Sequence, residues 1–198
     1  MYKQLGALAI AMLLVTGCGS DSGSDSDSNN EQVLVDVSSY TGNVTTDFST
    51  VNNPNNAWSY GEMTTSFTDF SLLSADSSSG IDSWFKNATI YINTTDSIRH
   101  GAESGQLVMH PGSGELPAVV RWTAPEAGEY SIIGEFGAGD SGFMQVGIRK
   151  DNDFLFQAPD SGTFDLNVSV QKNEVIDFVV YGGYYYGTTT LDVVVTKK

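Results

Sequence analysis

The second half of the chain alternates apolar and polar residues with a period of two. In residues 118–123 (AVVRWT), Ala118, Val120 and Trp122 share one parity and the intervening residues the other. Successive side chains of a β-strand point to opposite faces, so this pattern predicts a half-buried strand. The same alternation recurs in five further stretches: 130–136, 144–148, 164–170, 176–180 and 191–195. No window shows a sustained helical repeat of apolar residues.

Turn residues separate these stretches at short intervals. KDND (150–153) favours a hairpin turn because Asp and Asn bond to their own backbone, and APEAG (124–128) places Pro125 in another turn. Six or more strands at this spacing predict an all-β fold, an antiparallel β-sandwich or barrel. Further strands are expected over 60–70 and 88–93. Residues 32–198 are expected to form a single domain, since they are enough for one core.

The N-terminus has the features of an export signal. Lys3 precedes an apolar stretch, residues 5–15, that is too short to span a bilayer comfortably. The following VTGC (15–18) resembles a bacterial lipobox. The resemblance implies that residues 1–17 are a lipoprotein signal peptide and that Cys18 carries the lipid. The alternative is an ordinary secretory signal with an incidental Cys. Cys18 is the only Cys of the chain, so no internal disulfide is possible.

A polar segment follows the lipobox. From Cys18 to residue 31 the chain is rich in Ser, Gly and Asp and lacks apolar residues after the Cys, so it is expected to be a flexible, acidic linker. Gly19 occupies the position where an Asp suggests inner-membrane retention in enterobacteria-like systems. The resemblance therefore implies a location in the bacterial cell envelope, at the outer membrane, with the lipid anchor as the contact to the membrane.

The charge balance restricts the partners. The chain has 9 basic and 24 acidic residues; loss of Lys3 with the signal would leave eight against 24, a net charge of −16. Such a chain repels phosphate backbones and anionic headgroups and contains no basic run. Nucleic-acid binding is therefore excluded, and neutral ligands, calcium and basic partners remain.

Several phrases resemble a known domain type. NPNNAWSYG (53–61), RWTAPEAGEY (121–130) and VIDFVVYGG (175–183) are similar to jelly-roll β-sandwich domains of exported bacterial proteins, related to carbohydrate-binding modules. The resemblance implies a jelly-roll fold and a glycan ligand. One feature departs from the usual form, because similar domains have an Asp just before the final strand, where this chain has Gly187 and Thr188.

Aromatic side chains are the candidate ligand-binding residues, because the apolar face of a pyranose packs on flat rings. Trp122 is in phase with core residues and is expected to be buried. Trp84, between polar residues after a Gly/Ser-rich loop, is expected to be the exposed Trp. The candidates are Trp58, Tyr60, Trp84, Tyr184 and Tyr186. In an extended segment Tyr184 and Tyr186 would share a face; the alternative is a solvated rim of tyrosines.

A structural calcium ion is a further expectation, since Asp residues in turns suit this hard cation. The candidate ligands are Asp140, Asp151 and Asp153, with Asp160 nearby in sequence. No catalytic residue is assigned, because the nucleophile motif Gly-x-Ser-x-Gly is absent and His110 is expected to make a structural hydrogen bond. The leading hypothesis is a non-catalytic lipoprotein that binds a glycan. The alternative is a structural or protein-interaction module of the envelope.

Overall fold

The computed structural model describes residues 40–140 and 143–198. The predicted signal peptide, Cys18 and the linker lie outside the described residues, and so does residue 32, the predicted start of the domain. No helix in the described part is long and apolar enough to cross a membrane. The regular elements there are strands. They are β1 (Thr41–Asn43), β2 (Trp58–Glu62), β3 (Ser71–Leu72), β4 (Ser74–Asp76), β5 (Ser83–Phe85), β6 (Thr89–Ile92), β7 (Leu107–His110), β8 (Ala118–Thr123), β9 (Gly128–Gly137), β10 (Gln145–Lys150), β11 (Asp153–Pro159), β12 (Gly162–Val170), β13 (Val175–Tyr181) and β14 (Thr189–Lys197).

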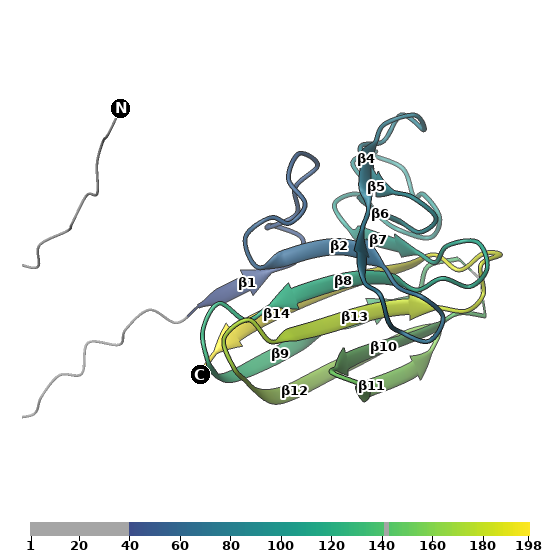
Figure 1. Cartoon of the computed structure of the whole chain (residues 1–198). Helices are drawn as coiled ribbons and strands as arrows, with labels where there is room; N and C mark the ends of the chain where they lie inside the picture. Colours follow the sequence, from purple (N-terminus) through teal and green to yellow (C-terminus); the bar gives the residue numbers. More distant parts are fainter. Residues whose placement is uncertain (1–39, 141–142) are drawn as a thin grey trace, which may run out of the picture. The chain divides into compact units, whose positions relative to one another are not determined.

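The strands form two sheets, which we call the large and the small sheet (Figure 1). The large sheet has the order β12-β9-β14-β7-β6-β5-β4, with β1 also paired to β14. The small sheet has the order β11-β10-β13-β8-β2-β3. All pairs are antiparallel, and the fold is a jelly-roll-like β-sandwich. This confirms the all-β antiparallel fold that alternation predicts and the jelly-roll form that the resemblance implies. The six predicted strands correspond to β8, β9, β10, β12, β13 and β14.

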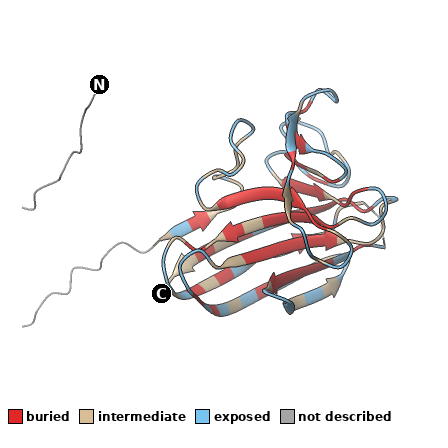
Figure 2. Ribbon diagram, viewed as in Figure 1, coloured by how far each residue is buried: buried red, intermediate tan, exposed pale blue. Residues whose placement is uncertain are grey.

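The core lies between the two sheets and is built from residues of one parity in each strand (Figure 2). Trp58 and Trp122 are fully buried there, and the ring of Trp122 meets that of Tyr130 edge-on at 4.8 Å. Burial of Trp122 is therefore confirmed. Large aromatic rings supply most of the apolar area that stabilises such a core.

The outer face of the small sheet is covered. Residues 60–70 were expected to be one strand, but β2 ends at Glu62 and the chain then folds back as a loop. This loop places Phe70 over the guanidinium of Arg121, 3.8 Å from the ring centroid. Arg121 in turn makes two hydrogen bonds to the carboxylate of Asp177, of 2.7 and 2.9 Å. Cation–π packing on this ion pair outweighs the strand preference of the segment.

Glu62 joins the small sheet to the turn between β5 and β6. Its buried carboxylate accepts hydrogen bonds from the backbone N–H groups of Asn87 and Ala88, both 3.1 Å, and lies 3.0 Å from the ammonium of Lys86. Burial alone would raise the pKa of Glu62. The hydrogen bonds from Lys86, Ala88 and Asn87 outweigh burial and hold the pKa below its ordinary value. This contact fixes β5 and β6, which carry the candidate site.

Candidate functional site

A groove of about 490 Å³ lies on the outer face of the large sheet, over β4 to β7. The strand register explains its floor, because two rows of paired residues face outward there. One row contains Asp76, Ser83 and Tyr91, which are neighbours across β4, β5 and β6. The other row contains Phe85, Thr89 and His110, neighbours across β5, β6 and β7.

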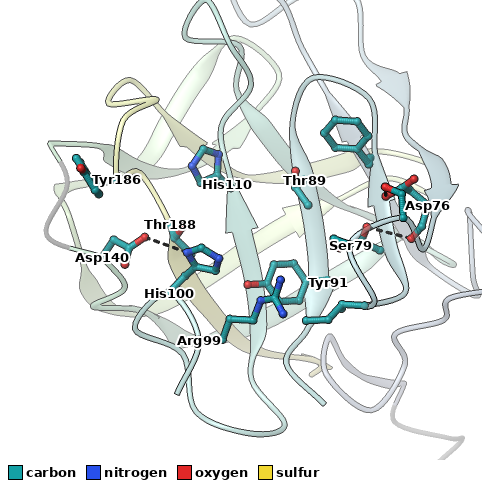
Figure 3. Close-up of a pocket in the computed structure, with 14 residues that line it drawn as sticks. Asp76, Ser79, Thr89, Tyr91, Arg99, His100, His110, Asp140, Tyr186 and Thr188 are labelled. Atoms are coloured by element: carbon teal, nitrogen blue, oxygen red, sulfur yellow. Dashed lines mark hydrogen bonds and ion pairs between the residues drawn. The ribbon is translucent and has the colours of Figure 1, made fainter. Parts of the chain in front are cut away.

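Four loops form the walls of the groove: β4–β5, β6–β7, β9–β10 and β13–β14. Figure 3 shows Asp140, His100 and Tyr186 toward one end and Asp76 with Ser79 toward the other. Arg99 lies beside Tyr91, and Thr188 beside His100. A pocket of this size, with rings and a few polar groups, is typical of small-ligand sites.

The β6–β7 loop is held over the sheet by Asn93. This fully buried side chain donates hydrogen bonds of 3.0 Å to the carbonyls of Ser97 and Ala102. Ala102 itself packs in a small apolar cluster with Ile81, Tyr91 and Val108. The loop is therefore ordered before any ligand binds, and it presents the side chains of residues 99 and 100 to the groove.

Tyr91 offers an unpaired hydroxyl in the groove. The residue is only 7% exposed, and its hydroxyl has no hydrogen-bond partner in the described part of the chain. Burial raises the pKa of this hydroxyl, and the positive charge and side-chain contact of the neighbouring Arg99 partly offset that effect. The phenol therefore stays protonated at neutral pH and lies under the guanidinium side of the groove. Arg99 forms no ion pair with any described residue.

Both histidines of the chain line this groove. The Nδ1 of His110 lies 2.7 Å from the carbonyl of Pro111, as the predicted structural hydrogen bond requires. Burial lowers the pKa of His110, so the ring is neutral at pH 7. In that state Nδ1 carries the proton and Nε2 is an acceptor. His100 lies 3.5 Å from Asp140, and this contact joins the β6–β7 and β9–β10 loops.

Two aromatic rings in the groove are open to solvent. Phe85 is 44% exposed on β5, and Tyr186 is 71% exposed in the β13–β14 loop. The charged groups of the groove leave only one net negative charge, because Asp76 and Asp140 oppose Arg99. The site therefore differs from the acidic chain as a whole, and its chemistry suits a polyhydroxyl ligand with an apolar face.

The structure contradicts the expected exposure of Trp84. Trp84 is only 5% exposed and donates a hydrogen bond of 2.7 Å from Nε1 to the carbonyl of Ser49. Trp58 and Tyr60 are fully buried, and the ring of Tyr60 stacks on that of Trp84. These three candidates belong to the core and offer no surface to a ligand in this conformation.

The tyrosine run is a turn, which corrects the extended geometry considered for it. Tyr186 has φ of 64°, in the left-handed region, so alternation does not apply. Tyr186 lines the groove, Tyr185 is 79% exposed, and Tyr184 packs edge-on against the ring of His110 at 5.6 Å. One of the two predicted tyrosines, Tyr186, is therefore part of the groove. The other, Tyr184, does not line the groove but contacts His110, which does.

The proposed calcium ligands do not converge. Asp140 precedes β10, whereas Asp151 and Asp153 follow it, so the six residues of β10 separate them. At about 3.3 Å per residue they lie at opposite ends of that strand. In the described part of the chain, no group of three or more His, Cys, Asp or Glu residues is placed to hold a metal. The three Asp residues therefore do not meet at one point in the described structure.

Sequence reasoning missed Phe85, Tyr91 and Arg99 as groove residues. A weak signal was present for the first two. Once Trp84 and Ile90 are assigned to the core, alternation places Phe85 and Tyr91 on the opposite face. Arg99 lies in a loop where no periodicity applies, and nothing in the sequence separates it from other surface cations.

The chain matches no protein family and no curated protein. Among solved structures, it is similar to a family 35 carbohydrate-binding module from an environmental isolate (TM-score 0.30, 13% identity), over 41% of this chain and 66% of that one. It is also similar to one from Clostridium thermocellum (TM-score 0.36, 12% identity; 56% and 88% covered). A third is the K1 cleaved adhesin domain of Lys-gingipain from Porphyromonas gingivalis W83 (TM-score 0.42, 9% identity; 81% and 98% covered). At these levels of likeness no ligand is indicated for this chain, whose fold is an antiparallel β-sandwich.

Proposed function

We propose that this protein is a non-catalytic, lipid-anchored envelope protein whose β-sandwich binds a saccharide in the groove over β4 to β7. The carrying observation is a groove in which two solvent-exposed rings, Phe85 and Tyr186, stand beside polar side chains, among them Arg99 next to Tyr91. Rings pack on the C–H face of a sugar, and the polar groups complement its hydroxyls.

The polar groups of the groove complement sugar hydroxyls. Arg99 donates, Asp76 and Asp140 accept, and neutral His110 offers Nε2 as an acceptor. Each hydroxyl of a sugar both donates and accepts, so a mixed set of this kind satisfies it. Because the charges nearly balance, the site does not require a strongly charged ligand.

The binding test uses affinity electrophoresis of the purified full chain in gels containing xylan, laminarin, galactomannan or polygalacturonate, which we call the test panel. At least one of the four is expected to retard the protein. Phe85→Ala and Tyr186→Ala should each weaken that retardation about tenfold, since each removes about 1.4 kcal/mol of ring packing. The matched control is Leu155→Ala on β11, which removes an exposed apolar side chain far from β4 to β7 in the strand order.

Two outcomes contradict the proposal. If no polysaccharide of the test panel retards the chain, the groove is not a saccharide site and an envelope protein partner becomes the better account. If the chain releases new reducing ends from a panel member, and Asp140→Asn abolishes the release, the protein is an enzyme.

The anchor is proposed from the resemblance of residues 15–18 to a lipobox, and it lies outside the described residues. Cells expressing the full chain and fed a labelled fatty acid should incorporate the label into it, and Cys18→Ser should remove the label and release the protein from the membrane fraction. Stable anchoring requires more than one acyl chain, as bacterial lipid anchors provide. Label that persists in the Cys18→Ser variant would place the lipid elsewhere.

A further inference from the structure

A set of aromatic side chains continues outward from the groove at the β13–β14 end. We call Phe143, Tyr184 and Tyr185 the rim. Phe143 is 88% exposed and Tyr185 79% exposed, which makes them, with Val51, the most exposed large apolar side chains among the described residues. Large rings left in water are costly for a monomer and often mark a binding surface.

The two loops that carry the rim touch each other. At Gly183, a Cβ atom would lie 2.7 Å from the backbone nitrogen of Met144 and 2.8 Å from the carbonyl carbon of Phe143. Gly183 also has φ of 57°, a conformation that glycine adopts without strain. The glycine therefore permits the β9–β10 and β13–β14 loops to pack backbone against backbone, which brings Phe143 beside the tyrosine run.

The rings form a continuous path from the groove. His110 lines the groove, the ring of Tyr184 packs on it at 5.6 Å, and the ring of Tyr185 packs on Tyr184 at 5.3 Å. Tyr186, the next residue, lines the groove at its edge (Figure 3). Tyr186 has a left-handed φ, so the chain turns at this residue. The same turn therefore carries one tyrosine of the groove, Tyr186, and one of the rim, Tyr185.

The chemistry of the two parts differs. The groove combines rings with a guanidinium, carboxylates, imidazoles and hydroxyls, which read the pattern of individual sugar hydroxyls. The rim offers three rings and two phenolic hydroxyls, and none of its three residues is charged. Stacking on rings tolerates many sugars, because each pyranose has an apolar face. The groove therefore determines which sugar unit binds. The rim adds apolar contact area for the sugar units next to the one in the groove.

We infer that the ligand is a polysaccharide chain of several units, which occupies the groove with one part and crosses the rim with the next. This inference rests on the proposed saccharide function and goes beyond it, because a free monosaccharide or a chain end alone would leave the rim unused. A protein partner or a second copy of this chain is the competing occupant of the rim.

Calorimetric titration of the full chain tests this with the di- and hexasaccharide derived from each polysaccharide of the test panel. The hexasaccharide is expected to bind at least tenfold more tightly than the disaccharide. Tyr185→Ala and Phe143→Ala should weaken hexasaccharide binding about threefold to tenfold and leave disaccharide binding within twofold. Tyr186→Ala, in the groove, should weaken both. Leu155→Ala again serves as the control.

The outcomes separate the two proposals. Absence of binding by every saccharide defeats the proposed function and the inference together. Binding that is independent of chain length, or unaffected by the Tyr185 and Phe143 changes, defeats only the inference and leaves the groove as a site for a short saccharide. Loss of self-association in the rim variants, measured by sedimentation without any change in hexasaccharide affinity, assigns the rim to a second copy instead.

Discussion

At the scale of single residues, two tyrosine hydroxyls are buried without a hydrogen-bond partner in the described part of the chain. One belongs to Tyr91 in the groove, the other to Tyr60 in the core. Burial raises the pKa of both, and the charge of Asp47 raises that of Tyr60 further. An unpaired buried hydroxyl costs stability, and the two tyrosines differ in that Tyr91 lines the groove, beside Arg99, whereas Tyr60 lies in the core.

These two tyrosines form a matched pair of variants. Tyr91→Phe and Tyr60→Phe should each raise the free energy of unfolding by about 1 kcal/mol, because each removes an unsatisfied polar atom. Tyr91→Phe alone should also weaken saccharide binding, by about fivefold. Urea denaturation and calorimetric titration measure the two effects. Unchanged affinity in Tyr91→Phe would show that the Tyr91 hydroxyl does not contact the ligand.

The difference between Trp84 and Phe85 shows how far residue-level reasoning reaches. Composition around Trp84 suggested exposure, yet the register pairs Trp84 with Ile90 on the inner face and Phe85 with Thr89 on the outer face. Strand β5 has three residues, which is too few for alternation to be recognised. A shift of one residue in the assignment moves a side chain from the core face to the groove face of the sheet. Longer strands such as β12 and β14 carry enough repeats to fix their phase.

At the scale of elements, the contact between Glu62 and the β5–β6 turn holds the groove in place. The pKa of Glu62 is lower in the folded chain than its ordinary value of 4.5. The ionised carboxylate therefore stabilises the fold above the unfolded pKa. This stabilisation is lost as the pH falls through the folded pKa.

Glu62→Gln is expected to lower the free energy of unfolding at pH 7 by about 2 kcal/mol, because hydrogen bonds to a charged acceptor are replaced by weaker ones. The variant should also lose less stability than the parent as the pH falls below 4.5. Denaturation at a series of pH values between 7 and 3 measures both. Equal losses in variant and parent would mean that other carboxylates govern acid unfolding.

Loops limit what the sequence predicts at this scale. The six long alternating strands were predicted, and so was β6 within residues 88–93. Strands β1, β3, β4, β5, β7 and β11 were not recognised, and residues 63–70 were wrongly assigned to a strand. The last error arises because Phe67 and Phe70 cover the outer face of the small sheet, on its apolar cluster and on Arg149 and Arg121, and do not lie between the sheets. Periodicity records only which side chains are apolar and does not record what they pack against.

At the scale of the whole molecule, the outer faces of the two sheets differ. That of the small sheet is covered by a loop, whereas that of the large sheet contains the groove. The loop after β2 covers the small sheet, while four loops surround β4 to β7 of the large sheet and leave the groove between them. Alternation predicted an antiparallel sandwich or barrel, and the resemblance to jelly-roll domains favoured the sandwich. The groove was not predicted, because its walls come from four loops that are distant in sequence and meet only in the folded chain.

The most direct test of the account is amide-resolved NMR of the isotope-labelled full chain, titrated with the hexasaccharide of the polysaccharide that retards it most. We expect the amide signals of Phe85, Thr89, Tyr91, Arg99 and Tyr186 to shift with saturation, and those around Arg121 on the small sheet to stay unchanged. Shifts confined to the small sheet, or no saturable shift with any hexasaccharide of the test panel, would contradict saccharide binding in the groove.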